Sequence, residues 1–148
     1  MLPTSHAIIS GILGYGIYKC SGSAPAGCAA FLSGILIDFD HHIDYLIAKG
    51  RIPLSYKKLF YFCSYDSYPK IYLLFHAWEY LALLWFFIYI AKLHVIWIGF
   101  ALGLTTHMIC DQWVNPLKPL GYFLIYRIKQ GFLKRKILTD EYFSQQIR

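Results

Sequence analysis

Five side chains that can bind a metal ion lie within one short stretch of the sequence. Residues 35–45 read I-L-I-D-F-D-H-H-I-D-Y and contain three aspartates and two histidines: Asp38, Asp40, His41, His42 and Asp44. The stretch follows an apolar run, residues 24–37, next to which uncompensated charge is costly in a membrane-like setting. Carboxylates and imidazoles are ligands that divalent Zn, Mn and Fe accept. We therefore predict that a bound divalent metal compensates these acids.

Further imidazole and carboxylate groups recur at helical spacing. His107 and Asp111 are four residues apart, and His76 and Glu79 are three apart, so each pair would share one face of a helix. His6 lies at the start of the first apolar segment. Helix bundles build metal sites from such inward-projecting carboxylates and histidines. We therefore expect the other helices to supply ligands as well.

The predicted metal ligands come from four apolar segments: His6, Asp38, Asp40, His76, His107 and Asp111. Glu79 and His41 are predicted to act as general base or as groups that orient a ligand. The set would bind one or two ions, with Zn²⁺ first and Mn²⁺ or Fe²⁺ as alternatives. We interpret His42 and Asp44 as solvent-facing, and His94 as lying at the opposite end of the bundle and not a ligand. Taken singly, each histidine has a structural alternative as a hydrogen-bonded core residue, and each aspartate has one as a helix cap.

The composition is more apolar than that of an average soluble chain. Apolar residues make up 57% and charged residues 15% of 148 residues, whereas soluble domains carry about 25% charged residues. A chain of this size has too much surface to hide so much apolar area in water. We therefore expect one all-α domain, residues 1–148, which is an integral membrane helical bundle. The alternative is a very apolar soluble helical domain.

The expected bundle has four membrane-spanning helices: Ser5–Tyr18, Pro25–Ile37, Ile71–Ala91 and Leu93–Val114. Small residues four apart predict a tight hairpin of the first two, and Gly99 and Gly103 predict close packing of the fourth. Residues 54–65 are expected to form an amphipathic interfacial helix. Residues 120–128 would form a fifth, interfacial or re-entrant piece.

The positive charge has a topological interpretation. The net charge is +6, and the basic residues concentrate in a loop, residues 45–70, and a tail, residues 129–148. The positive-inside rule then predicts a multi-pass protein of the inner membrane with this loop and both termini in the cytoplasm. Nucleic acid is not an expected partner. Membrane lipids and a small-molecule or lipid substrate are. In this topology the candidate ligands all fall at one end of the bundle.

The candidate ligands carry a family resemblance. The segment G-I-L-I-D-F-D-H, residues 34–41, resembles the LPDxDH-type motif of the membrane-bound metal-dependent hydrolase family, small inner-membrane proteins that are often grouped with zinc-dependent phospholipase C-like proteins. His6 is similar to the family's N-terminal histidine and His76 to its middle histidine. Residues 107–111 are similar to its final H-x-x-x-D. The resemblance covers the chain to about Pro116 and implies a membrane-bound metal site.

The sequence departs from the family pattern at two places. Ile37 stands where the family has proline, and the H-R-G that precedes the middle histidine is absent. We interpret Glu79 as a replacement for one lost ligand.

These observations predict a membrane-embedded metal-dependent hydrolase. It would act on an anionic phosphoester or lipid-like substrate through a metal-activated water. Basic residues on the cytoplasmic side would suit an anionic head group. The alternative is a non-catalytic metal-binding or structural membrane protein with a closed ligand set. A third possibility is a buried Asp–His network without metal, which predicts that chelators leave thermal stability unchanged.

Overall fold

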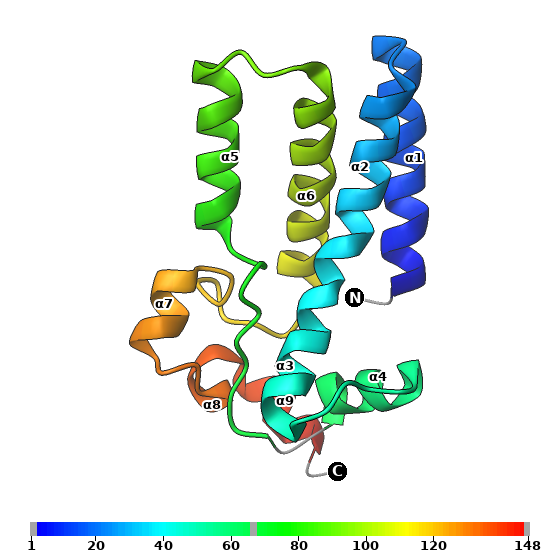
Figure 1. Ribbon diagram of the computed structural model, residues 1–148. Helices are drawn as coiled ribbons and strands as arrows, with labels where there is room; N and C mark the ends of the chain where they lie inside the picture. Colours follow the sequence, from blue (N-terminus) through cyan, green and yellow to red (C-terminus); the bar gives the residue numbers. More distant parts are fainter. Residues whose placement is uncertain (1–2, 66–67, 147–148) are drawn as a thin grey trace. The chain divides into compact units, whose positions relative to one another are not determined.

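The structure is a computed structural model that describes residues 3–65 and 68–146. Within these ranges the named secondary-structure elements are all helical, so the all-α prediction is confirmed (Figure 1). The chain divides into two compact units, and the single domain over residues 1–148 stays a prediction. Unit 1 comprises Met1–Ile37 and Trp78–Asn115, and unit 2 comprises Asp38–Ala77 and Pro116–Arg148. Residues 66–67 of the predicted basic loop and 147–148 of the predicted tail lie outside the described residues.

Unit 1 is made of four helices: α1 (Pro3–Ser21), α2 (Ala24–Leu36), α5 (Trp78–Ile90) and α6 (Val95–Val114) (Figure 1). The ends of these helices have local causes. The Ser23 side chain caps α2 by accepting a hydrogen bond from the Ala26 amide, with proline in the first turn. The His94 side chain caps α6 in the same way, so this residue has a structural role, and it was not predicted to be a ligand.

Glycines bring the helices of unit 1 into close contact. A Cβ atom added at Gly14 of α1 would lie 2.6 Å from the Gly27 carbonyl oxygen of α2, so neither position tolerates a side chain. A Cβ atom at Gly99 of α6 would collide with the backbone of Ala26 in α2. The tight hairpin and the close packing of the fourth segment, both predicted from small-residue spacing, are thus confirmed.

The membrane-spanning prediction is wrong. Within the described ranges no helix combines the length and the apolar character needed to cross a bilayer. The helices α2 and α5 have 13 residues each, which span about 20 Å at 1.5 Å per residue, against about 30 Å of hydrocarbon. The helices α1 and α6 are longer, but polar residues interrupt their apolar runs. The predicted four-span bundle with its interfacial segment, and the multi-pass inner-membrane location with cytoplasmic termini, are therefore corrected.

Unit 2 contains shorter helices: α3 (Asp40–Lys49), α4 (Tyr56–Tyr65), α7 (Leu124–Lys129), α8 (Lys134–Ile137) and α9 (Asp140–Gln146). A 3-10 turn, Ile37–Phe39, precedes α3. Gly50 ends α3 in the left-handed conformation at φ 67°. Tyr45 of α3 packs against Leu59 and Phe62 of α4 in a small apolar core. Two isolated backbone bridges join distant parts of unit 2, Lys70 with Leu133 and Leu117 with Leu138.

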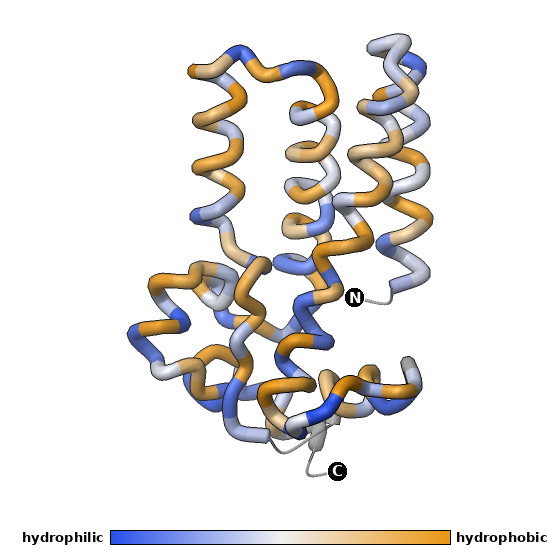
Figure 2. The backbone as a smooth tube through the Cα atoms, in the orientation of Figure 1, coloured by the Kyte–Doolittle hydropathy of each residue, from blue (hydrophilic) through white to orange (hydrophobic). Residues whose placement is uncertain are grey.

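The predicted third span shows why the sequence was misread. Residues 71–91 are largely apolar, with His76 and Glu79 as exceptions, yet the helix begins only at Trp78. Residues 71–77 are not helical, because carboxylates of α3 accept hydrogen bonds from their backbone amides. In Figure 2 the stretch around α3 carries hydrophilic colours and α5 is largely hydrophobic. The polar helix α3 thus sets where the apolar helix α5 starts.

Candidate metal centre

Unit 1 brings three predicted ligands together. His6 Nε2 lies 3.0 Å from Asp111 Oδ1, across 105 residues of sequence. His107 Nε2 lies 3.3 Å from Asp111 Oδ2. The two imidazole rings stack with centroids 3.9 Å apart. All three residues are buried, so this carboxylate and both rings face one another away from bulk solvent.

A backbone carbonyl determines the tautomer of His107. Its Nδ1 lies 2.8 Å from the carbonyl oxygen of Gly34. A carbonyl oxygen only accepts, so Nδ1 carries the hydrogen and donates it. The neutral His107 ring then presents a lone pair at Nε2 to Asp111 Oδ2, which is also an acceptor. Two acceptors at 3.3 Å repel each other unless a cation, a proton or a metal ion, is shared between them.

One distance in this cluster fits a metal ion. Zn²⁺ binds imidazole nitrogen and carboxylate oxygen at about 2.0–2.2 Å, so neighbouring ligand atoms of one tetrahedral ion lie roughly 3.3–3.6 Å apart. The distance of 3.3 Å from His107 Nε2 to Asp111 Oδ2 falls in this range, whereas the 3.0 Å from His6 Nε2 to Asp111 Oδ1 is that of an ordinary hydrogen bond. Burial by itself would raise the pKa of Asp111. When the shared cation is a proton on His107, the hydrogen bonds that Asp111 accepts from His107 and His6 outweigh burial and lower this pKa well below its usual range. The carboxylate is therefore ionised and suited to a cation.

Unit 2 contains a second cluster with the same arrangement. His76 Nδ1 lies 3.1 Å from Asp40 Oδ2, an oxygen that also accepts from the Phe75 and His76 amides at 2.7 and 3.2 Å. This oxygen is an acceptor, so Nδ1 carries the hydrogen. His76 Nε2 then faces Asp38 Oδ1 at 3.6 Å. His41 Nε2 lies 3.8 Å from the same oxygen. An imidazole lone pair and a carboxylate again face each other.

Asp40 lies behind His76 in this arrangement. It was predicted to be a ligand. In the structure its Oδ2 atom instead accepts hydrogen bonds from the Phe75 amide and from the ring of His76. A carboxylate that accepts from the outer nitrogen of a histidine fixes the ring and raises its basicity as a ligand. Asp40 is fully buried, and its Oδ1 atom has no hydrogen-bond partner among the described residues.

Asp44 is buried, so its predicted solvent-facing position is wrong. Its carboxylate accepts from the Tyr72 amide at 3.0 Å and from the Leu73 amide at 3.2 Å. Leu73 has φ 44°, a left-handed conformation that is uncommon for a residue with a Cβ atom. Burial raises the pKa of Asp44 to about 6, although the two amides oppose this. Asp44 lies one helical turn after Asp40, so both carboxylates bind the same segment.

Sequence reasoning also missed Arg127. This side chain of α7 is fully buried, and its Nη2 atom donates to the His76 carbonyl oxygen at 2.8 Å. The signal that could have found it is local. Arg127 is the only charged residue in the apolar run of residues 120–128, and a charge in such a run is usually paired.

The remaining candidates occupy other places. Glu79 lies half-buried in the first turn of α5 in unit 1. His42 is half-buried and stacks on Phe39, with ring centroids 5.1 Å apart, so its solvent-facing prediction holds only in part.

Both units therefore contain side chains that could hold a metal ion: His107 and Asp111 in unit 1, and Asp38 and His76 in unit 2. The predicted presence of a possible His and Asp metal site is confirmed at this level.

No family model, no curated protein and no solved structure matches this chain. The resemblance to the metal-dependent hydrolase family stays a prediction that depends on the motif residues.

Proposed function

We propose that this protein is a metal-dependent hydrolase that acts on an anionic phosphoester. The observation that supports a metal ion is the contact between His107 Nε2 and Asp111 Oδ2. These two acceptor atoms lie 3.3 Å apart and need a cation shared between them. The imidazole and carboxylate donor set without thiolate suits Zn²⁺ first, with Mn²⁺ and Fe²⁺ as alternatives, as one or two ions. When bound, such an ion supplies Lewis-acid polarisation of a phosphoryl oxygen and lowers the pKa of water.

The protein's own groups prepare the ligands. The Gly34 carbonyl holds the outer nitrogen of His107, and the Asp40 carboxylate holds that of His76. Nε2 of His107 therefore faces Asp111, and Nε2 of His76 faces Asp38, each in a fixed orientation. Metal binding then costs less side-chain entropy, because the rings are already oriented. Arg127 adds a hydrogen bond to the backbone of His76. It also supplies positive charge near the buried carboxylate of Asp44.

His41 is the general base in this proposal. The side chains of His41 and Asp38 are 28% and 23% exposed, so solvent and substrate can reach them. Histidine changes protonation near neutral pH and can take a proton from an attacking water. Its Nε2 atom lies 3.8 Å from Asp38 Oδ1, a carboxylate that would stabilise the imidazolium formed. Glu79, in the first turn of α5, is the alternative base.

Metal content and phosphodiester hydrolysis test this proposal together. The full chain, purified and loaded with Zn²⁺, is expected to contain at least one equivalent of metal and to hydrolyse bis(p-nitrophenyl) phosphate. His107→Ala should lose metal and activity, whereas His94→Ala, a histidine outside both clusters, should lose neither. His41→Ala should keep the metal and lower kcat by about 10²–10⁴, the usual contribution of a general base. The proposal fails if the loaded wild type binds no transition metal, or binds it and is inactive on phosphoesters.

A non-catalytic metal site is the second candidate. It is favoured by the burial of His76, His107 and Asp111, which are each at most 2% exposed, because structural sites are closed. In this case the wild type binds metal and shows no hydrolysis with Zn²⁺, Mn²⁺ or Fe²⁺.

A further inference from the structure

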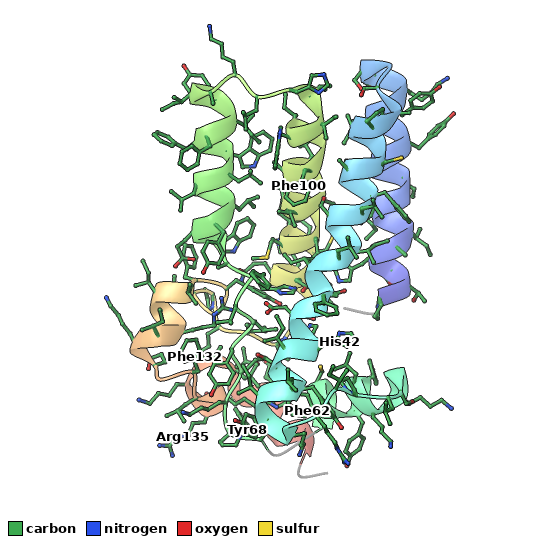
Figure 3. The ribbon with its side chains drawn as sticks, viewed as in Figure 1. His42, Phe62, Tyr68, Phe100, Phe132 and Arg135 are labelled. Atoms are coloured by element: carbon green, nitrogen blue, oxygen red, sulfur yellow. The ribbon has the colours of Figure 1, made fainter. Side chains whose placement is uncertain are left out.

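Helix α5 packs within unit 1 by one side. Leu81 and Ile88 are its buried residues, and because they lie seven residues apart they share one face of the helix. The indole N–H of Trp85 donates to the Thr105 hydroxyl of α6 at 3.1 Å. These contacts fix which side of α5 faces α6. Figure 3 shows that other side chains of α5 project away from α6, so the outward side of this helix is determined as well.

The outward side of α5 carries a second apolar stripe. Four of its residues follow one another at intervals of three, four and three, which is the spacing of a seam between two helices: Tyr80, Leu83, Phe87 and Ile90. Their exposed fractions are 45, 54, 58 and 60%. The sequence has no charged residue between positions 80 and 91. A helix that is apolar on all its sides is normally a buried helix, so this α5 stripe requires a cover.

The α5 stripe is large enough to hold two copies of the chain together. A large apolar or aromatic side chain has about 200 Å² of surface. The four stripe residues and the adjoining Phe86, which is 56% exposed, therefore offer roughly 550 Å² per copy. Two copies would bury about 1,100 Å² in total, and a specific interface needs about 1,000 Å². A second α5 helix has the same spacing, so the surface can pair with itself about a twofold axis.

We propose that two copies of this chain associate through the α5 stripe, packed against each other about a twofold axis. The rings of Phe86 and Phe87 contact edge to face with centroids 5.9 Å apart. They lie near the middle of the stripe and form the centre of the contact, where aromatic residues are enriched in protein interfaces. A lipid surface selects apolar residues without a spacing, whereas a second helix requires the helical spacing found here. None of the stripe residues is a candidate metal ligand or base, so the inference stands whether or not the chain is a hydrolase.

Sedimentation velocity of the full chain in detergent-free buffer, over a concentration range around the micromolar Kd expected for an interface of this size, tests the proposal. The wild type should shift with concentration from its monomer mass of 17.2 kDa to twice that mass. Phe87→Glu and Leu83→Glu each place a charge in the stripe and should weaken association at least tenfold. Tyr89→Glu is the matched control. It places the same charge on the same helix outside the stripe, where the side chain is 84% exposed, and should change the Kd less than twofold.

Loss of the dimer in the stripe variants, with the dimer retained in Tyr89→Glu, supports the proposal. A wild type that stays monomeric at the highest concentration overturns it. Equal loss in Tyr89→Glu also overturns it, because the effect is then one of added charge. A wild type that forms mixed larger species and becomes uniform only with phosphatidylcholine vesicles overturns it too, since the stripe then prefers a lipid surface. The substituted side chains are exposed, so each variant should fold, and its circular dichroism melting curve checks this.

Discussion

The outer nitrogen of each central histidine determines what its cluster can bind. A carbonyl oxygen of Gly34 accepts from His107 Nδ1, and a carboxylate oxygen of Asp40 accepts from His76 Nδ1. Both rings must therefore direct Nε2 at an aspartate that is itself an acceptor. His6 differs, because its Nε2 atom can meet Asp111 as an ordinary N–H donor. The requirement for a cation thus comes from His107 and His76 and not from His6.

Asp44 should make stability depend on pH. Its pKa is about 6 in the folded state against 3.8 for an unperturbed aspartate, so between these values the folded state binds more protons than the unfolded state. The unfolding free energy should then fall as pH rises from 4 to 6, by up to about 1.4 kcal/mol per pH unit, and stay level above 6. Urea unfolding of metal-free protein at pH 4, 5, 6 and 7 measures this.

The variant Asp44→Asn provides the control for that measurement. Asparagine does not titrate, so the stability difference between wild type and variant should shrink as pH rises from 4 to 6. The variant should also be less stable overall by about 1–3 kcal/mol, because its amide N–H groups would face the Tyr72 and Leu73 amides, which are donors as well. A difference that is constant over this pH range would show that Asp44 is equally ionised in both states.

At the scale of elements, α3 organises the segment that contains His76. Two carboxylates one turn apart on α3 accept from amides of residues 72–76 and hold that segment out of a helix. The left-handed Leu73 is part of this arrangement. The segment keeps its backbone hydrogen bonds, since carboxylates replace the helical carbonyls. The position of His76 therefore depends on α3 rather than on α5.

The packing of α2 against α6 should be sensitive to side-chain volume. The substitution Gly99→Val would place methyl groups against the backbone of Ala26, and we expect a loss of about 1–3 kcal/mol from overpacking. Gly16 of α1 is the matched control, because a Cβ atom there meets no heavy atom within 4 Å. Gly16→Ala should stabilise the helix by about 0.8–1 kcal/mol. Thermal unfolding followed by circular dichroism measures both, and equal effects would contradict the predicted contact.

At the scale of the molecule, the apolar composition leaves large side chains on the surface of unit 1. On α5 the large exposed apolar and aromatic side chains are Tyr80, Leu83, Phe86, Phe87, Tyr89 and Ile90. Composition averages over buried and exposed positions, so it cannot show that the helix that bears them has only 13 residues.

Metal removal should lower the stability of the whole protein if the proposed site is filled. Ligand binding to the folded state alone adds RT ln(1 + [L]/Kd), which is about 4 kcal/mol when free metal is 1,000 times Kd. Excess EDTA should therefore lower the Tm of Zn²⁺-loaded wild type and leave that of His107→Ala nearly unchanged. An unchanged Tm of the wild type would instead support a buried Asp–His network without metal.

Local pattern was enough to predict α1, α2 and α6 of unit 1 and the close approach at their small residues. It also predicted the association of His6, His107 and Asp111, since the four-residue spacing and the alternation of helices determine which ends meet. These features depend on neighbours in sequence or on short connections. The presence of a possible His and Asp metal site was therefore readable from residue type and position.

The tertiary structure decided where hydrogen bonds between distant residues compete with helix formation. The apolar run of residues 71–91 predicts one long helix, but Asp40 and Asp44 accept from the amides of its first part. The same contacts bury Asp44, and the adjacent backbone carbonyl of His76 accepts from buried Arg127. A carboxylate is solvated or buried according to which distant amides reach it, and no local periodicity contains that information.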